Sequence, residues 1–326
     1  MKTRNKRIMI ISGALLITAI FIAGAYRNTF SGINSNEIKP NPDNTSAEEN
    51  SVKPENMSDL ANNSTENPIS PVSIDNTSIF NPEGDTIYGR ISVPEGYERM
   101  ETTKGSFAYY LQNLPLKPHG SKVKYYDGGL KTKEVYDAVI DIDVGERDLQ
   151  QCADAVMRLW GEYLYGRGEY ERIHFNFTNG FRVDYSKWME GYRIVVEGNK
   201  SYWVKRENHS DSYADFRKYM DIIFAYAGTM SLIKEMEPVD IEDMQIGDVF
   251  IQSSPGHCVI VVDMAVNPLT GEKLFMIAQS YMPAQDIHIL KNMSSSQISP
   301  WYSLDFGDKL STPEWTFYRN DLRRFK

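Results

Sequence analysis

The sequence feature that most constrains the fold is a succession of four strand-like runs near the C-terminus. The runs are DVFIQ (248–252), HCVIVVDMA (257–265), KLFMIAQSY (273–281) and IHIL (287–290). They are rich in β-branched and aromatic residues, as strands are. The connections SSPG and VNPLTG between the first three runs are short, so these strands are predicted to be antiparallel neighbours in one sheet.

Two segments with helical spacing of apolar residues complete the pattern. Residues 146–168 (ERDLQQCADAVMRLWGEYLYGRG) are expected to form one helix, with Asp148 as its N-cap and Cys152 in or just beyond its first turn. Residues 212–236 are expected to form a second long helix that ends before Pro238. The predicted fold class is α+β, an antiparallel sheet packed against helices.

The chain divides into three parts by composition. Residues 1–26 join a basic start, MKTRNKR, to an uncharged run, and are predicted to anchor the chain in the cell membrane. Ala23-Gly24-Ala25 also fits a signal cleavage site, so a secreted protein is the alternative. Residues 27–85 are poor in aromatics and read as a solvated tether. Residues 86–326 are long enough for one extracytoplasmic α+β domain.

The net charge and the number of cysteines argue against two features, a nucleic-acid partner and a disulfide framework. The net charge of −9 argues against a nucleic-acid partner. The two cysteines, Cys152 and Cys258, are too few for a disulfide framework, although an exported protein could form one bond between them. Asp141 and Asp143 share a strand face, but no further ligand cluster follows them. Neither a metal nor another cofactor is expected.

Three residues have the types and the chain order of a thiol catalytic site. Cys152 near a helix N-terminus would have its thiolate stabilised by the helix dipole and free N–H groups, which can also hold an oxyanion. His257 would exchange the proton and Gln279 would orient the imidazole. A hairpin in which Met264 faces Glu272 places His257 opposite Gln279.

The alternation of side chains along a strand bears on the partner of Cys152. Neighbouring residues point to opposite faces, so if His257 faces the helix, Cys258 faces away. A Cys152–His257 pair and a Cys152–Cys258 disulfide are therefore expected to exclude each other. Purely structural roles also fit, with Cys152 as a small core residue and Gln279 bonded with Ser280 at the strand end.

A second group of residues suggests ligand binding. Tyr125, Tyr126 and Trp188 could line a groove for sugar or peptide, since such ligands stack on aromatic faces. Arg158 could meet an anionic ligand, and Ser280 stands beside the expected orienting residue. Burial in the core or simple solvation is the alternative for each of them.

Several long motifs resemble a known family. LQQCADAVMRLWGEYLY, GTMSLIKEM, GDVFIQSSPGHCVIVVDMAVNP, MIAQSYMPAQDIHILKN, SPWY and TPEW are similar to the bacterial domain of unknown function DUF4846. The resemblance covers nearly all of residues 86–326, and the family name implies no activity.

The stretch GDVFIQSSPGH also resembles the second half of the NlpC/P60 and CHAP cysteine hydrolases of the cell wall. This resemblance implies a papain-like fold with Cys152 as nucleophile, His257 as base and Gln279 as orienting residue. The residues around Cys152 depart from that pattern, because Gln-Gln precedes it and Ala-Asp-Ala follows it. Two hypotheses result: a hydrolase of amide bonds in cell-wall peptide or protein, or a non-catalytic module that binds cell-wall glycan or a protein partner.

Overall fold

The computed structural model describes residues 79–326. The expected membrane anchor (1–26) and most of the expected tether (27–85) lie outside the described residues. Residues 79–85 lie within them, and there Phe80 forms a β-bridge with Ile91. Among residues 79–326, none of the helices combines the length and the apolar character that crossing a bilayer requires.

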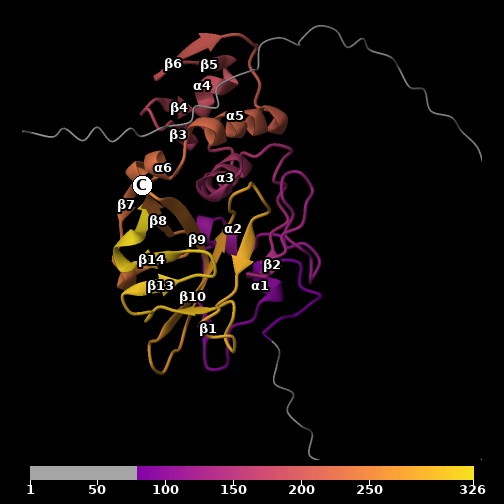
Figure 1. Cartoon of the computed structure of the whole chain (residues 1–326), viewed down its shortest axis with the longest axis vertical. Helices are drawn as coiled ribbons and strands as arrows, with labels where there is room; N and C mark the ends of the chain where they lie inside the picture. Colours follow the sequence, from indigo (N-terminus) through magenta and orange to yellow (C-terminus); the bar gives the residue numbers. More distant parts are fainter. Residues whose placement is uncertain (1–78) are drawn as a thin grey trace, which may run out of the picture. The chain divides into compact units, whose positions relative to one another are not determined.

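The centre of the described part is a nine-stranded antiparallel sheet (Figure 1). Its main path runs in the order β2-β11-β10-β9-β8-β15-β7, with β1 paired to β9 and β12 paired to β10. The strands are β1 (Glu98–Arg99), β2 (Tyr136–Val139), β7 (Met236–Pro238), β8 (Val249–Ser253), β9 (Gly256–Val266), β10 (Lys273–Gln279), β11 (His288–Leu290), β12 (Tyr302–Ser303) and β15 (Leu322–Phe325). The four predicted runs become β8, β9, β10 and β11, and their antiparallel pairing is confirmed.

The helices gather on one side of this sheet and above it. They are α1 (Ile87–Arg90), α2 (Phe107–Gln112), α3 (Cys152–Gly166), α4 (Tyr185–Met189), α5 (Tyr213–Tyr226) and α6 (Thr229–Glu235). The α+β class with an antiparallel sheet is therefore confirmed.

The expected single helix over 212–236 is wrong, because the chain breaks between α5 and α6. Ala227 and Gly228 are extended, and the Gly228 N–H donates to Ser231 Oγ at 3.1 Å, which starts a new helix. Glycine is a poor residue for the interior of a helix, so a break at this position is inexpensive.

The expected N-cap of α3 is also wrong. Gln151, not Asp148, is the N-cap residue, and its N–H donates to Asp154 Oδ2 at 2.9 Å. Asp148 instead accepts a hydrogen bond from the Ala284 N–H at 2.7 Å, which ties the loop before α3 to the loop after β10.

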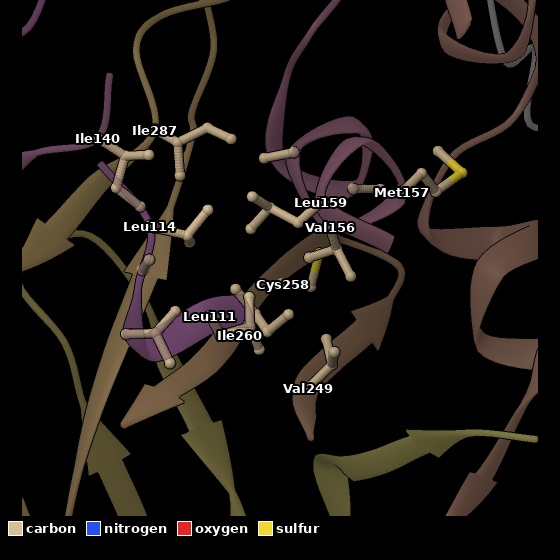
Figure 2. Packing of buried hydrophobic residues seen from close by; sticks show 14 of the residues in the cluster. Leu111, Leu114, Ile140, Val156, Met157, Leu159, Val249, Cys258, Ile260 and Ile287 are labelled. Atoms are coloured by element: carbon tan, nitrogen blue, oxygen red, sulfur yellow. The ribbon is translucent and has the colours of Figure 1, made fainter. Parts of the chain in front are cut away.

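Each face of the sheet packs against a different layer. Cys258 and Ile260 of β9 lie under α3, where they contact the same apolar core as Val156 (Figure 2). Val259 and Val261 point to the opposite face, which the hairpin of β13 (Lys309–Ser311) and β14 (Thr316–Tyr318) helps to cover. The strict alternation along the first half of β9 thus supplies side chains to two cores.

A segment between α3 and α6 forms an additional layer over α3 (Figure 1). Besides α4 and α5, it holds two hairpins, β3 (His174–Asn176) with β4 (Arg182–Asp184) and β5 (Tyr192–Glu197) with β6 (Lys200–Lys205). Helix α5 packs closely on α3 at Gly161, where an added Cβ would lie 3.2 Å from Met220 Sδ. The long separation of Cys152 from β9 along the chain is largely accounted for by this layer.

Candidate active site

Cys152 is the first residue of α3, so it lies in the first turn of a helix, as the sequence predicted. The first turn of a helix leaves its N–H groups without intrahelical acceptors, and the Ala153 N–H is among the donors to the Cys152 sulfur. Hydrogen bonds with Cys258 and His257, together with the charge of His257, lower the pKa of Cys152 from 9.0 to about 5 although burial acts in the opposite direction. The side chain of Cys152 is therefore stabilised as a thiolate.

Cys258 is the strongest single contributor to that shift. Burial raises the pKa of Cys258 well above its usual value, and its hydrogen bond with Cys152 raises it further. Cys258 therefore keeps its proton and donates its S–H to the Cys152 sulfur. Both thiols are free, and Cys152 is half-buried whereas Cys258 is fully buried.

A second acid beside the thiols is buried without a charge-compensating partner. Asp154 lies in the first turn of α3, and burial raises its pKa well above the usual value, with the nearby Cys152 charge acting in the same direction. A neutral Asp154 does not repel the Cys152 thiolate, so the two groups are compatible at this end of the helix.

His257 lies at the beginning of β9 and is only 1% exposed. Its Nε2 is 2.8 Å from Gln279 Oε1. Three aromatic rings surround the imidazole, those of Tyr281, Trp315 and Phe317, with ring centroids 4.9, 5.1 and 5.9 Å away. The ring is thus held in place and shielded from water on the face of the sheet opposite α3.

Gln279 reaches His257 although the predicted register is wrong. Met264 pairs with Phe275 rather than with Glu272, and a bulge follows between Met276 and Ile277. The bulge arises because two residues of β9 occupy the place of one residue of β10. His257 and Gln279 end on the same face as diagonal neighbours, a separation that a glutamine side chain spans.

A Cys152–His257 pair and a Cys152–Cys258 disulfide do not occur together, as expected, because both cysteines are free. Cys152 nevertheless forms hydrogen bonds with both His257 and Cys258. The β9–β10 ladder ends at the pair Ile260 and Ala278, so the start of β9 has no strand partner on that side. The loop before α3 lies next to this opening, where Ser280 Oγ donates to Gln150 O at 3.1 Å. Because the Cys152 side chain lies beyond the end of the β9–β10 ladder, it can contact both His257 on one face of β9 and Cys258 on the other.

The sequence reasoning missed a buried chain of polar groups behind Gln279. Gln279 Nε2 lies 2.8 Å from Glu314 Oε2 and 3.4 Å from His288 Nε2. Glu314 in turn pairs with Lys131 at 3.0 Å. The motif TPEW, which contains Glu314 and Trp315, was the available signal, although nothing in its spacing placed it next to the imidazole.

Three residues of the predicted binding set lie near this site. The Tyr126 N–H donates to Ala284 O at 2.9 Å, and Tyr125 forms a β-bridge with Gln285. Both tyrosines are half-buried and belong to a loop that pairs with the segment after β10, next to the Cys152 loop. Ser280 is fully buried, and its hydroxyl bonds the carbonyl oxygens of Gln150 and Gln285 rather than Gln279, which differs from the expected Gln279–Ser280 pair.

The other two predicted binding residues are buried, and Arg158 borders a cavity of about 250 Å³. Trp188 is 6% exposed and packs in the layer above α3, with the Arg193 guanidinium 4.1 Å from its ring centroid. Arg158 is 1% exposed and is satisfied by four residues, namely Asp143, Gln150, Glu162 and Tyr213. Burial gives both side chains a structural role.

A cavity in the described residues lies elsewhere and is not lined by Cys152. It measures about 470 Å³ and is bordered on one side by Trp160 and Phe325, whose rings stack with centroids 4.8 Å apart. Four cationic side chains also line it: Arg172, Arg182, Lys234 and Lys326. Among residues 79–326, no group of three or more His, Cys, Asp or Glu is arranged to hold a metal ion.

Comparison with known proteins gives one match. A family model described as a domain of unknown function (4846) matches residues 87–324. No curated protein and no solved structure matches the chain. The description of the family assigns no reaction and no ligand, so the geometry around Cys152 has to carry the functional argument.

Proposed function

The chain belongs to the DUF4846 family, and we propose that it is a cysteine hydrolase of amide bonds in cell-wall peptide or protein. In this proposal, residues 1–26 hold the catalytic domain outside the membrane, and the sheet with α3 is a papain-like arrangement. The observation that carries the proposal is the convergence of Cys152, His257 and Gln279 at the beginning of β9.

The first chemical step uses the low pKa of Cys152. The thiolate attacks the carbonyl carbon of the amide, and the carbonyl oxygen takes the negative charge. The free N–H groups in the first turn of α3 stabilise this oxyanion. His257, protonated in the ion pair, gives its proton to the amine nitrogen as the C–N bond breaks, which leaves a thioester on Cys152 and releases the amine.

The second step returns the enzyme to its first state. His257 removes a proton from a water molecule, the resulting hydroxide attacks the thioester carbon, and the C–S bond breaks to give a carboxylic acid and the Cys152 thiolate. The proton held by His257 restores the ion pair. Gln279 Oε1 accepts the Nε2–H of His257 in both steps, so Nδ1 is the ring nitrogen that exchanges protons.

The site has the environment that this chemistry needs. The rings of Tyr281, Trp315 and Phe317 keep water from His257, which strengthens the interaction between imidazolium and thiolate. The Tyr125–Tyr126 loop beside the Cys152 loop offers aromatic surface for a peptide or sugar. The choice of the cell wall as substrate is supported by the resemblance of GDVFIQSSPGH to the NlpC/P60 and CHAP hydrolases.

The test is incubation of the purified protein with muropeptides and measurement of newly formed amines. We expect amines from the unchanged protein, fewer from Cys258→Ala, which lacks the S–H that lowers the pKa of Cys152, and none from Cys152→Ala, which lacks the nucleophile. Iodoacetamide should alkylate Cys152 much faster than Cys258 at pH 7, since only Cys152 is ionised there. Undiminished amine release by Cys152→Ala would assign the activity to another site.

The cation-lined cavity favours a second function, a module that binds an anionic cell-wall glycan. In a chain of net charge −9, the four cations outnumber the two glutamates, Glu171 and Glu235, that line the same cavity of about 470 Å³. The stacked Trp160–Phe325 pair offers a surface for a sugar ring. Glycan binding that is weakened by Arg182→Gln and unchanged by Cys152→Ala would favour this function over hydrolysis.

A further inference from the structure

We propose that Glu314, held by Lys131, is a positioning residue that fixes the amide of Gln279 and through it the tautomer of His257. This inference rests on the proposed function, because it explains how the Cys152–His257 pair is kept in its reactive form. Neither Glu314 nor Lys131 contacts the thiol, so both act through other residues.

The nitrogen end of the Gln279 amide faces Glu314. A carboxylate has only acceptor sites, so the atom that lies 2.8 Å from Glu314 Oε2 has to be the amide nitrogen. His288 imposes the same choice. Its Nδ1 lies 2.8 Å from the carbonyl oxygen of Asp286 and therefore carries a proton, which leaves Nε2 as an acceptor 3.4 Å from the Gln279 nitrogen.

Burial keeps His288 in that neutral form. Desolvation lowers the pKa of His288 to about 4, so the ring is uncharged at neutral pH and its Nε2 remains an acceptor. Two independent acceptors, Glu314 and His288, thus select one orientation of the Gln279 amide.

That orientation of the Gln279 amide fixes the tautomer of His257. With its nitrogen facing Glu314, Gln279 presents Oε1 to His257 Nε2 at 2.8 Å. An amide oxygen only accepts, so Nε2 of His257 carries a proton and Nδ1 is left to exchange one with Cys152. The reverse orientation would point an N–H at Nε2 and would disfavour the imidazolium that pairs with the thiolate.

Lys131 makes the buried Glu314 carboxylate behind Gln279 tolerable. The Lys131 side chain is 4% exposed and that of Glu314 is 9% exposed. Lys131 Nζ lies 3.0 Å from both oxygens of Glu314 and 2.9 Å from Gln285 Oε1. The lysine compensates the charge and fixes both carboxylate oxygens, so that Oε2 stays directed at Gln279.

The inference also gives the TPEW motif a role. Trp315, the next residue, packs against the His257 ring, and its Nε1–H donates to Gln252 Oε1 at 2.9 Å. The motif therefore acts on His257 in two ways. The indole of Trp315 packs against the imidazole, and Glu314 is linked to the imidazole through the hydrogen bonds of Gln279.

The test compares two double variants that both lack the ion pair. Lys131→Met/Glu314→Gln keeps an oxygen that can accept from Gln279, whereas Lys131→Met/Glu314→Met has no acceptor. The measurement is the pH dependence of Cys152 alkylation by iodoacetamide, which requires no substrate, with thermal unfolding as a check on folding. A shift of one pH unit in the midpoint would slow alkylation at pH 5 roughly fivefold.

We expect that shift or a larger one for the methionine variant and little shift for the glutamine variant. A folded methionine variant with an unchanged midpoint would overturn the proposal, and so would an equal shift in both variants. Failure of the unchanged protein to release amines from muropeptides would contradict the proposed hydrolase function. The midpoints of Cys152 alkylation would not be affected by that failure and would still test the role of Glu314.

A second measurement covers the case in which the methionine variant does not fold. In Cys152→Ala the imidazole of His257 loses its thiolate partner, and its ¹⁵N resonances report the neutral tautomer. We expect a proton on Nε2. A proton on Nδ1 would contradict the assigned orientation of Gln279 and overturn the proposal.

Discussion

Helix α3 carries two charged side chains that the sequence marked as functional, Cys152 at its first turn and Arg158 two turns later. Arg158 is 1% exposed, and carboxylates, an amide and a hydroxyl occupy its guanidinium from every side. Cys152 is half-buried, and its negative charge is stabilised by the S–H of Cys258, by His257 and by a backbone N–H.

The difference lies in what remains available to another molecule. Each N–H group of Arg158 that points into the protein has a fixed acceptor, so the network is closed and its contribution is to stability. The groups around Cys152 lower its pKa, and the residue remains only half-buried. A buried charge with complete partners holds a fold together, whereas an ionised group with solvent access can react.

The largest effect that separates the two regions should come from Arg158→Met. Removing the guanidinium leaves Glu162 and Gln150 without their partner, and we expect a loss of about 3 kcal/mol in the free energy of unfolding, typical of a broken buried pair. Denaturant unfolding measures the loss. The midpoint of Cys152 alkylation should stay near pH 5 in the folded fraction, and a large shift there would show that the two regions are coupled.

His257→Gln should produce the opposite result, with a chemical effect that exceeds the structural one. Without the imidazole, a contribution that lowers the pKa of Cys152 is lost, and we expect alkylation at pH 6 to slow about tenfold or more. Iodoacetamide kinetics between pH 4 and pH 9 give the midpoint. A variant with unchanged kinetics would show that Cys258 alone stabilises the thiolate.

The pH dependence of stability follows from the same shift. Folding lowers the pKa of Cys152 from 9.0 to about 5, which means that the thiolate of Cys152 is more stable in the folded protein than in the unfolded chain. The stability gained from ionisation is fully present above pH 9 and is lost as the pH falls through 5. The unfolding free energies of the unchanged protein and of Cys152→Ala should therefore diverge as the pH rises, and a constant difference would contradict the low pKa.

The smallest effect is expected at the hairpin that presents His257. A Cβ on Gly256 would lie 2.3 Å from Thr229 Oγ1, so Gly256→Ala should move the turn and cost roughly 1 kcal/mol in stability. Gly256→Ala/Thr229→Ala removes the atom in conflict and should recover most of the loss. Failure of the double variant to recover would place the strain in the backbone of the turn instead.

The C-terminal strands were predictable because their signal is local. Alternation, β-branched residues and short connections lie within β8, β9 and β10, and no distant residue overrides them. The position of Cys152 at the start of a helix was also readable from the apolar spacing after it. The register of β9 on β10 was not, because a bulge at Met276 and Ile277 inserts one residue without a mark in the composition.

The candidate site was predictable only in part for the same reason. Cys152, His257 and Gln279 could be selected by residue type and order, and the hydrogen bond between His257 and Gln279 is present in the structure. Glu314 and Lys131 could not be selected, since each is an ordinary charged residue in a loop until the chain folds around Gln279. Arg158 and Trp188 had the residue types of a binding site, and burial by the layer above α3 gave them another role.

By itself, the amino-acid sequence determined that β8, β9 and β10 are antiparallel neighbours and that Cys152 lies at the start of a helix, because those preferences are decided by neighbours a few positions apart. Tertiary structure alone decided that Cys152 meets both faces of β9 and that Glu314 and Lys131 lie behind Gln279. The first contact depends on where the β9–β10 ladder ends, and the second depends on two opposite charges being buried side by side. Both are properties of the folded chain and not of local sequence.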